Sequence, residues 1–320
     1  MEKRAKNAGG NPAWDVIEEV KKAVIGKDQC ISRAMTAILA GGHILLEDIP
    51  GVCKTTLAVA LSRAMELKQN RVQFTPDVLP ADIVGFSMYQ KETGKFVYQP
   101  GAVMCNLLLA DEINRTSPKT QSALLEVMEE GKVTVDGVSK PVPEPFIVIA
   151  TQNPIGSAGT QLLPESQMDR FMICMTMGYP DIQDEIEIIK GKSKRMAEQE
   201  IQPVIHAEHL LAMQEAVGNI YVHDAVYQYI GELVKATREH DLIQLGVSPR
   251  GTIALAKMAK ANAFLQNRGY VLPQDVADVF LDVTAHRIRL SAKARISKVD
   301  ADAVLGQILE QVKRPSVRRG

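Results

Sequence analysis

The chain has 320 residues, of which 46% are hydrophobic and 23% are charged, fractions typical of a globular protein large enough for two compact domains. Its formal net charge of −1 gives no electrostatic argument for a general nucleic-acid or membrane-surface binder, because such proteins usually carry a basic excess or a basic face. We expect a cytoplasmic protein without a signal peptide or a membrane span, since no apolar stretch reaches the ~18 to 20 residues that cross a bilayer.

The first half of the chain alternates between helical and strand-like patterns. Apolar residues spaced by three or four predict helices between residues 14 and 40, and another helix after the decapeptide EDIPGVCKTT. Short apolar runs predict strands at residues 43–46, 72–74, 106–110, 146–150 and 172–177. Buried strands that alternate with helices indicate an α/β fold with a parallel sheet covered on both faces.

Two segments interrupt this pattern and predict β-hairpins inserted between the sheet elements. In GFSMYQKETGKFVYQPG, aromatic and polar residues alternate on both sides of a turn at 92–95. In GKVTVDGVSKPV, alternating valines flank Asp136 and Gly137, a dipeptide that favours hairpin turns. The segment between the hairpins predicts a helix that is capped by Ser117 and ends at Gly131.

Beyond about residue 180 the strand signal fades and the remaining segments read as amphipathic helices. We therefore predict an α/β core over residues 1–185 and a helical domain over residues 186–320. Since no Gly/Ser-rich linker separates them, we expect the two parts to pack closely.

The decapeptide EDIPGVCKTT, between a predicted strand and a predicted helix, is a candidate phosphate-binding loop. Such a loop needs inward-facing backbone N–H groups, a helix N-terminus and a lysine that reaches the outer phosphates. Gly51 permits the turn, Lys54 supplies the cation, and Thr55 offers a hydroxyl to Mg²⁺. An ordinary turn is the alternative, because Asp48 and Cys53 occupy both glycine positions of the strict pattern Gly-x-x-x-x-Gly-Lys-Ser/Thr.

Polar residues follow two other predicted strands. Asp111 and Glu112 end one strand, at the sheet edge where the loop is expected. Asp111 can hold Mg²⁺ through water there, and Glu112 can orient or deprotonate an attacking water. Asn153 follows another strand and can contact a terminal phosphate or that water, with a simple Asn-Pro turn as the alternative.

Two arginines complete the candidate residues. Arg170 precedes a predicted strand, and it can neutralise transition-state charge at a neighbouring subunit's phosphate or form a structural salt bridge. Spacing alone does not choose between these two roles. Arg250 lies in the first turn of a predicted helix, where its charge opposes the helix dipole, so an outside phosphate or carboxylate would explain it.

In chain order, the segments VIGKD, EDIPGVCKTTLA, LLLADEINRTSPKTQSALLEVMEEGKVTVDG, VIATQNP, LPESQMDRF and VSPRG resemble those of the MoxR family of AAA+ ATPases. The resemblance implies an αβα P-loop core followed by an all-α lid, ATP and Mg²⁺ as cofactors, and assembly into a hexamer. It also implies a chaperone-like activity on a protein client, often with a von Willebrand factor A-domain partner. The two hairpins look like the family's insertions, which in related motors face the ring's pore or its substrate.

The resemblance also implies a role for each matching residue. Those of the nucleotide site are Gly51, Val52, Cys53, Lys54, Thr55 and Thr56 (Walker A), Asp111 and Glu112 (Walker B), Asn153 (sensor 1), Arg170 (arginine finger), Arg250 (sensor 2), and Val24, Ile25 and Gly26 near adenine. Thr55 and Asp111 are the implied Mg²⁺ ligands, and Glu112, Asn153, Arg170 and Arg250 the implied catalytic residues.

The two departures from the Walker A pattern leave questions open. Asp48 can accept hydrogen bonds from the loop, whereas Cys53 puts a side chain where the backbone must approach the phosphates. Our hypothesis is that Cys53 makes the site redox-sensitive, and an inert small residue is the alternative. Two other functions are a chelatase-type motor that drives metal insertion and a scaffold that binds ATP and hardly hydrolyses it.

Overall fold

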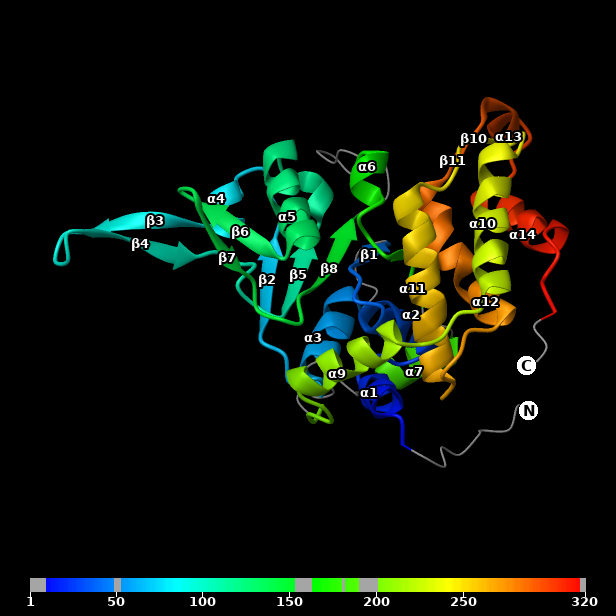
Figure 1. Ribbon diagram of the computed structural model, residues 1–320. Coiled ribbons are helices and arrows are strands. Elements are labelled where there is room, and N and C mark those ends of the chain that lie inside the picture. Colours follow the sequence, from blue (N-terminus) through cyan, green and yellow to red (C-terminus); the bar gives the residue numbers. More distant parts are fainter. Residues whose placement is uncertain (1–9, 49–52, 153–162, 180–181, 190–200, 317–320) are drawn as a thin grey trace.

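The computed structural model describes residues 10–48, 53–152, 163–179, 182–189 and 201–316. They form a central sheet with helices on both faces and a helical part packed beside it (Figure 1). The parallel strands of the sheet lie in the order β2 (Gln69–Gln73), β5 (Leu107–Asp111), β8 (Ile147–Gln152), β1 (Ile44–Glu47) and β9 (Ile173–Met175). All five strand segments predicted from the sequence are therefore present in one sheet.

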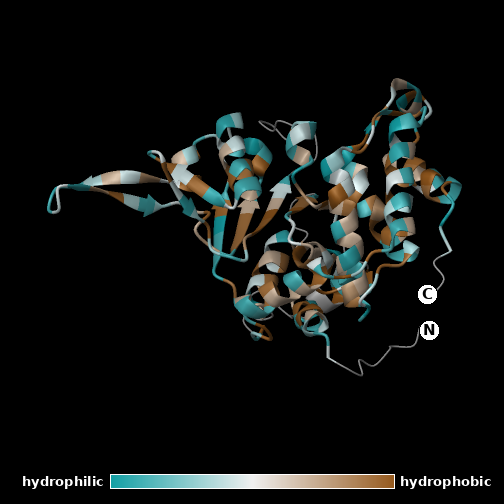
Figure 2. Ribbon diagram, in the orientation of Figure 1, coloured by the Kyte–Doolittle hydropathy of each residue, from teal (hydrophilic) through white to brown (hydrophobic). Residues whose placement is uncertain are grey.

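The central strands are buried on both faces, and successive side chains enter different clusters. Leu107 and Leu109 of β5 join one apolar cluster, whereas Leu108 and Ala110 join the other. This two-residue alternation follows from the pleat of a strand, and it explains why these strands read as continuous apolar runs. Figure 2 shows β5 and β8 as hydrophobic strands in the middle of the molecule.

Helices cover the two faces. The first cluster contains residues of α1 (Pro12–Lys21), α2 (Asp28–Leu39) and α3 (Lys54–Ala64), and the second contains residues of α4 (Pro80–Val84) and α5 (Pro118–Glu130). The limits of α5 agree with the sequence, because the Ser117 side chain accepts a hydrogen bond from the Thr120 N–H and Gly131 ends the helix with φ 62°. A 3₁₀ turn, η1 (Ile113–Arg115), connects β5 to this helix region.

Both predicted hairpins are present. The first, β3 (Gly85–Gln90) with β4 (Lys95–Pro100), projects from the body as an extended ribbon (Figure 1). The second consists of β6 (Lys132–Val135) and β7 (Val138–Pro141), joined by Asp136 and Gly137 with φ of 51° and 77°. Both turn residues are left-handed, as a tight two-residue hairpin requires.

The chain continues through α6 (Glu165–Met168) and α7 (Ile182–Ile189) into the helical part. Its elements are α9 (Ala207–Gly218), α10 (Asp224–Glu239), β10 (Ile243–Leu245), α11 (Pro249–Leu265), α12 (Pro273–Thr284), η2 (Ala285–Arg287), β11 (Arg289–Leu290), α13 (Ala292–Ile296) and α14 (Ala301–Gln311). The short antiparallel ribbon β10–β11 is an exception to the all-α prediction. Strands this short are not visible in a sequence, because they carry no alternation.

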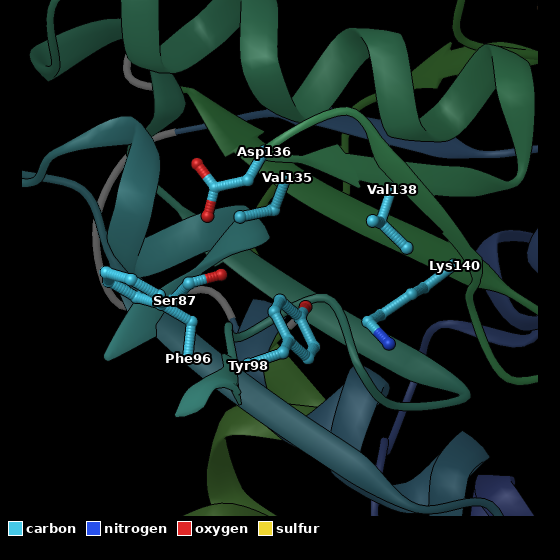
Figure 3. Close-up of a pocket in the computed structure, with 7 residues that line it drawn as sticks. All are labelled: Ser87, Phe96, Tyr98, Val135, Asp136, Val138 and Lys140. Atoms are coloured by element: carbon cyan, nitrogen blue, oxygen red, sulfur yellow. The ribbon is translucent and has the colours of Figure 1, made fainter. Parts of the chain in front are cut away.

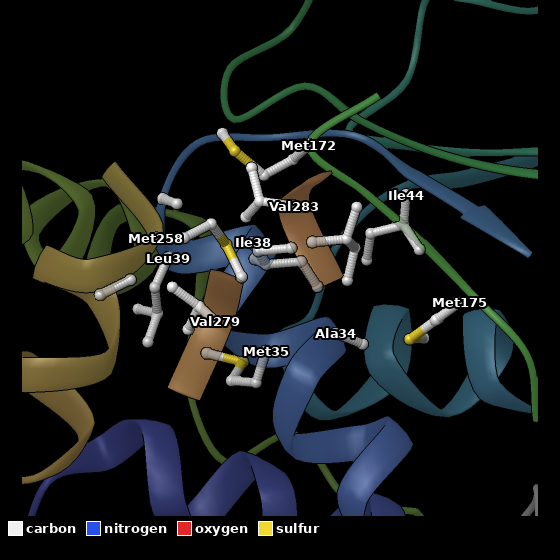
Figure 4. Packing of buried hydrophobic residues seen from close by; sticks show 14 of the residues in the cluster. Ala34, Met35, Ile38, Leu39, Ile44, Met172, Met175, Met258, Val279 and Val283 are labelled. Carbon is white, nitrogen blue, oxygen red and sulfur yellow. The ribbon is translucent and has the colours of Figure 1, made fainter. Parts of the chain in front are cut away.

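The helical part packs closely on the core, as the missing linker predicted. Residues of α2, including Met35 and Ile38, share one apolar cluster with Met258 of α11 and Val279 of α12 (Figure 4). The sequence boundary near residue 185 falls within α7 and remains a prediction. Within the described ranges, no helix has the length and apolar character needed to span a membrane.

Candidate functional site

Lys54 is the first residue of α3 and lies at the carboxyl edge of the sheet, where β1 ends. Its Nζ donates a hydrogen bond to the backbone oxygen of Asp48 over 2.7 Å. Burial lowers the pKa of Lys54, whereas the negative charges of Asp48, Asp111 and Glu112 act in the opposite direction. The fold thus brings the lysine of the candidate loop near both acids at the end of β5.

The first turn of α3 supplies two hydroxyl groups. Thr55 is half-buried, and Thr56 is fully buried. The Oγ1 of Thr56 has no hydrogen-bond partner within the described residues. A buried hydroxyl without a partner costs ~1–3 kcal/mol, so a phosphate oxygen at this helix N-terminus would relieve that cost.

The side chains in this region fit a magnesium nucleotide. The hydroxyl of Thr55 and the carboxylate of Asp111 are oxygen ligands of the type that Mg²⁺ prefers. Lys54 and the N-terminus of α3 provide the positive potential that phosphates require. Gly51 and Val52, also predicted for this loop, lie outside the described residues.

Cys53 is the residue before α3, and its backbone has φ 59° and ψ 18°, in the left-handed region. A non-glycine residue there costs ~1–2 kcal/mol. This geometry explains why the strict loop pattern has a glycine at the position. The Cys53 side chain is half-buried and packs against the main apolar cluster, which agrees with the reading as an inert small residue.

Asp48 replaces the first glycine of the pattern, and its side chain connects the start of the loop to the segment that follows β9. Its Oδ2 accepts hydrogen bonds from the N–H groups of Met177 (2.6 Å) and Gly178 (2.8 Å), which follow β9. The carboxylate thus fixes the end of β9 beside the start of the loop, a role that the sequence did not predict.

Both oxygens of the Asp111 carboxylate accept hydrogen bonds that hold it in place. Oδ1 accepts a hydrogen bond from the Thr151 hydroxyl over 3.3 Å, and Oδ2 accepts one from Arg71 Nε over 2.7 Å. The Thr151 oxygen in turn accepts a hydrogen bond from the backbone N–H of Glu112 over 2.9 Å. Neighbouring strands β2, β5 and β8 therefore fix the two acids at one edge of the sheet.

Glu112 has a left-handed backbone, with φ 56° and ψ 48°, at the entry to η1. Such a conformation persists for a non-glycine residue only when the surroundings impose it, and it is often associated with functional sites. Its Oε2 accepts a hydrogen bond from Arg115 Nη1 over 2.6 Å. Asn153, the predicted sensor beyond β8, lies outside the described residues.

The segment predicted to lie near adenine follows α1 and contacts α7. Val24 is buried, Ile25 is half-buried and Gly26 has φ 73°. A Cβ at Gly26 would collide with the carboxylate of Asp184, so this position requires glycine for space as well as for conformation. Among the described contacts, none joins this segment to Lys54.

Arg170 and Arg250 lie together, away from Lys54. Arg170 shortly precedes Ile173, which pairs with Ile44 at the start of β1, so Arg170 lies at the amino edge of the sheet. Lys54 follows the carboxyl end of β1, a strand of 4 residues that alone spans about 13 Å. Both arginines form ion pairs with Glu129 at the end of α5. The predicted set is thus divided between opposite edges of the sheet.

Arg71, Thr151 and Glu129 are site residues that the sequence did not predict. Thr151 had a detectable signal, because it begins the polar end of an apolar strand, two residues before the expected Asn153. Arg71 fits the pattern of its strand and Glu129 the pattern of its helix, so neither residue gives a separate signal of function in the sequence. Their contacts become visible only from the order of the strands and the packing of the helical part.

Comparison with known proteins agrees with this architecture. Residues 43–173 match the family described as the ATPase family associated with various cellular activities (AAA), and residues 235–308 match the AAA lid domain. The chain is 45% identical to the uncharacterised protein YeaC of Bacillus subtilis (strain 168), over 94% of each protein. It is 39% identical to chaperone MoxR1 of Mycobacterium tuberculosis, over 94% of this chain and 82% of that protein. A solved structure of a predicted ATPase from Cytophaga hutchinsonii is 38% identical, with a TM-score of 0.88 over 96% of each chain.

Proposed function

Because the chain belongs to the MoxR family of AAA+ ATPases, we propose that it hydrolyses ATP in a ring of copies and uses the energy to remodel a protein client. The observation that carries the proposal is the division of the site. Lys54, Asp111 and Glu112 lie together at one sheet edge, whereas Arg170 lies at the other. A complete hydrolytic site therefore needs two copies of the chain.

In this proposal, the carboxyl edge of each copy binds the nucleotide. Lys54 and the backbone N–H groups of residues 51–56 contact the phosphates, and Thr55 and Asp111 hold the metal. Bound Mg²⁺ would neutralise charge on the phosphates. Glu112 orients the attacking water and accepts its proton, while Thr151 fixes the backbone of Glu112.

The remaining residues of the nucleotide site keep their predicted roles in the proposal. Residues 24–26 contact the adenine, and Asn153 contacts the terminal phosphate or the water. These assignments rest on the matching motifs.

The amino edge of a second copy supplies the positive charge. Arg170 and Arg250 share Glu129, so one displacement of that copy would bring both guanidinium groups to the same phosphate. Stabilising the charge that develops on the transferred phosphoryl group is a large part of catalysis in such reactions. An interface that joins opposite edges is heterologous, and such an interface forms a ring when the rotation between successive copies closes. We propose the family's hexamer.

The two hairpins are the proposed contact with a protein client. Phe86, Met88, Tyr89 and Phe96 of the β3–β4 ribbon are all exposed, with Phe96 at 73%. Phe96 and Tyr98 of the ribbon line one cavity of ≈ 500 Å³ together with Val138 and Lys140 of the second hairpin (Figure 3). Exposed apolar side chains on projecting elements favour protein contacts. A von Willebrand factor A-domain partner is proposed from the family alone.

The Glu112→Gln variant tests the proposal. We expect it to bind ATP with the affinity of the unaltered protein but to hydrolyse it at least about a hundredfold more slowly, because an amide cannot take the proton. Glu126→Gln, an exposed change on α5, is the matched control. Steady-state hydrolysis that survives in Glu112→Gln would refute the assignment. A single-turnover assay on the assembled protein would separate a hydrolase from a nucleotide-gated scaffold.

A further inference from the structure

Glu129, at the carboxyl end of α5, joins two arginines that come from different parts of the chain. Its Oε2 lies 3.2 Å from Arg170 Nη2, and its Oε1 accepts a hydrogen bond from Arg250 Nη2. Arg170 belongs to the core, whereas Arg250 lies in the first turn of α11 in the helical part. One carboxylate therefore fixes the distance between two cations across the junction of the two parts.

The location of Glu129 is unfavourable for the helix itself. A negative charge in the last turn opposes the helix dipole, and α5 has no basic residue in that turn. Arg250 has the converse problem, because it places a positive charge in the first turn of α11. The contact between them relieves both, which explains why these residue types lie at these two positions.

A neighbouring ion pair separates this arrangement from ordinary packing. Asp169 binds Arg287, whose side chain is only 2% exposed, and it also accepts a hydrogen bond from the Ser248 hydroxyl. By contrast, Arg170 and Arg250 are 30% and 43% exposed. Asp169 thus pairs closely with a buried arginine and lies 4.0 Å from Arg250 Nη1, whereas Glu129 pairs with two arginines whose side chains remain partly exposed.

Glu129 leaves donors of both arginines free for another anion. A guanidinium carries five N–H donors, and each contact with Glu129 uses one nitrogen. Arg170 and Arg250 also line a cavity of ≈ 160 Å³ together with Lys257. Since half-exposed ion pairs stabilise a fold only weakly, the arrangement is better explained by positioning than by stability.

We propose that Glu129 is a positioning residue that holds Arg170 and Arg250 as one two-arginine unit for the terminal phosphate bound by a neighbouring copy. The inference rests on the proposed function and adds a residue to it. It assigns Glu129 no contact with nucleotide in either copy. Its effect is to reduce the freedom of two long side chains before the copies meet, which lowers the entropic cost of placing them.

The test is the Glu129→Gln variant, which keeps the size of the side chain and removes its charge. We expect kcat for ATP hydrolysis to fall about tenfold, while KM and nucleotide binding stay within about twofold, because the variant's own Lys54 lies at the opposite edge. Glu130→Gln is the matched control, since Glu130 pairs only with the exposed Lys132 among the described residues. Adding Glu129→Gln to Arg170→Ala should lower the small residual rate of that variant by much less than tenfold, because the two changes affect one unit.

ATP hydrolysis by mixed assemblies distinguishes a positioning role of Glu129 from a purely structural one. Glu129→Gln copies keep an intact Glu112, so mixing them with Glu112→Gln copies, which keep Glu129 and both arginines, should restore part of the lost activity. An unchanged or raised kcat in Glu129→Gln, or no gain on mixing, would overturn the inference. If Arg170→Ala copies are rescued by the same mixing and Glu129→Gln copies are not, only the role of Glu129 fails. If the unaltered protein does not hydrolyse ATP, the proposed function fails, and the inference about Glu129 fails as well.

Discussion

Arg71 Nε donates a hydrogen bond over 2.7 Å to Oδ2 of Asp111, the carboxylate assigned to Mg²⁺. Arg71 is 53% exposed, whereas Asp111 is 9% exposed, so the surroundings confine the guanidinium much less than the carboxylate. A positive charge this close to a metal ligand disfavours the metal. The pair therefore affects how much Mg²⁺ the site requires.

We predict that Arg71→Met lowers the Mg²⁺ concentration for half-maximal nucleotide binding by about threefold, a modest effect because solvent screens the half-exposed arginine. A titration of Mg²⁺ with a fluorescent ATP analogue measures it. Lys68→Met removes an equal charge from an exposed position shortly before β2 and should leave the Mg²⁺ dependence unchanged. A higher Mg²⁺ requirement in Arg71→Met would show instead that Arg71 orients Asp111 for the metal.

Cys53 is predicted to be better replaced by glycine than by alanine. Its left-handed backbone, with φ 59°, is strained for any residue with a Cβ and free for glycine. Cys53→Gly should raise the free energy of unfolding by up to ~1 kcal/mol, and Cys53→Ala should not raise it. Chemical denaturation of the three proteins decides the question. Equal stabilities for glycine and alanine would show that the backbone is relaxed.

The redox hypothesis for Cys53 has a separate test. Labelling of Cys53 by a mild thiol reagent, followed by an ATPase assay, shows whether the thiol affects the site. The half-buried side chain packs against the apolar cluster, so we expect hydrolysis to survive mild modification of the thiol. Unchanged activity after demonstrated labelling would end the hypothesis.

His43 makes stability depend on pH. It is buried, its Nδ1 accepts a hydrogen bond from the Val148 N–H, and its Nε2 contacts the Met128 oxygen, so the neutral ring has its proton on Nε2. Burial lowers the pKa of His43 from 6.5 to about 4. As the pH falls below 6.5 the unfolded chain takes up a proton that the folded chain excludes until about pH 4.

The free energy of unfolding should therefore fall between pH 6.5 and 4, with His43 contributing roughly 3 kcal/mol of the loss. His43→Gln removes the titration and keeps an amide in its place. The difference in stability between the two proteins should shrink as the pH is lowered, because only the unaltered protein incurs the protonation penalty. A difference that stays constant from pH 7 to pH 4 would contradict the assignment.

The sequence predicted the sheet and the hairpins because their signals are local. Leu107 to Ala110 form an apolar run whose burial needs no knowledge of the partners, and Asp136-Gly137 determines its own turn. The ribbon β10–β11 escaped prediction because its strands are too short to show a period.

The sequence predicted many of the residues of the candidate site but only some of the contacts between them. Lys54 and Asp111 converge because parallel strands place their carboxyl ends at one edge. The pair between Arg71 and Asp111 depends on β2 lying beside β5, and the link from Glu129 to Arg250 depends on how α11 packs on the core. Such contacts between distant segments have no sequence period to reveal them.

The central claim is that one copy supplies Lys54, Asp111 and Glu112 while another supplies Arg170. ATP hydrolysis by an equimolar mixture of Arg170→Ala and Glu112→Gln copies tests it most directly. Neither variant alone should hydrolyse ATP appreciably. Random assembly should pair intact Glu112 with intact Arg170 at about a quarter of the interfaces and restore activity accordingly. A mixture as inactive as its components would contradict a site shared between copies.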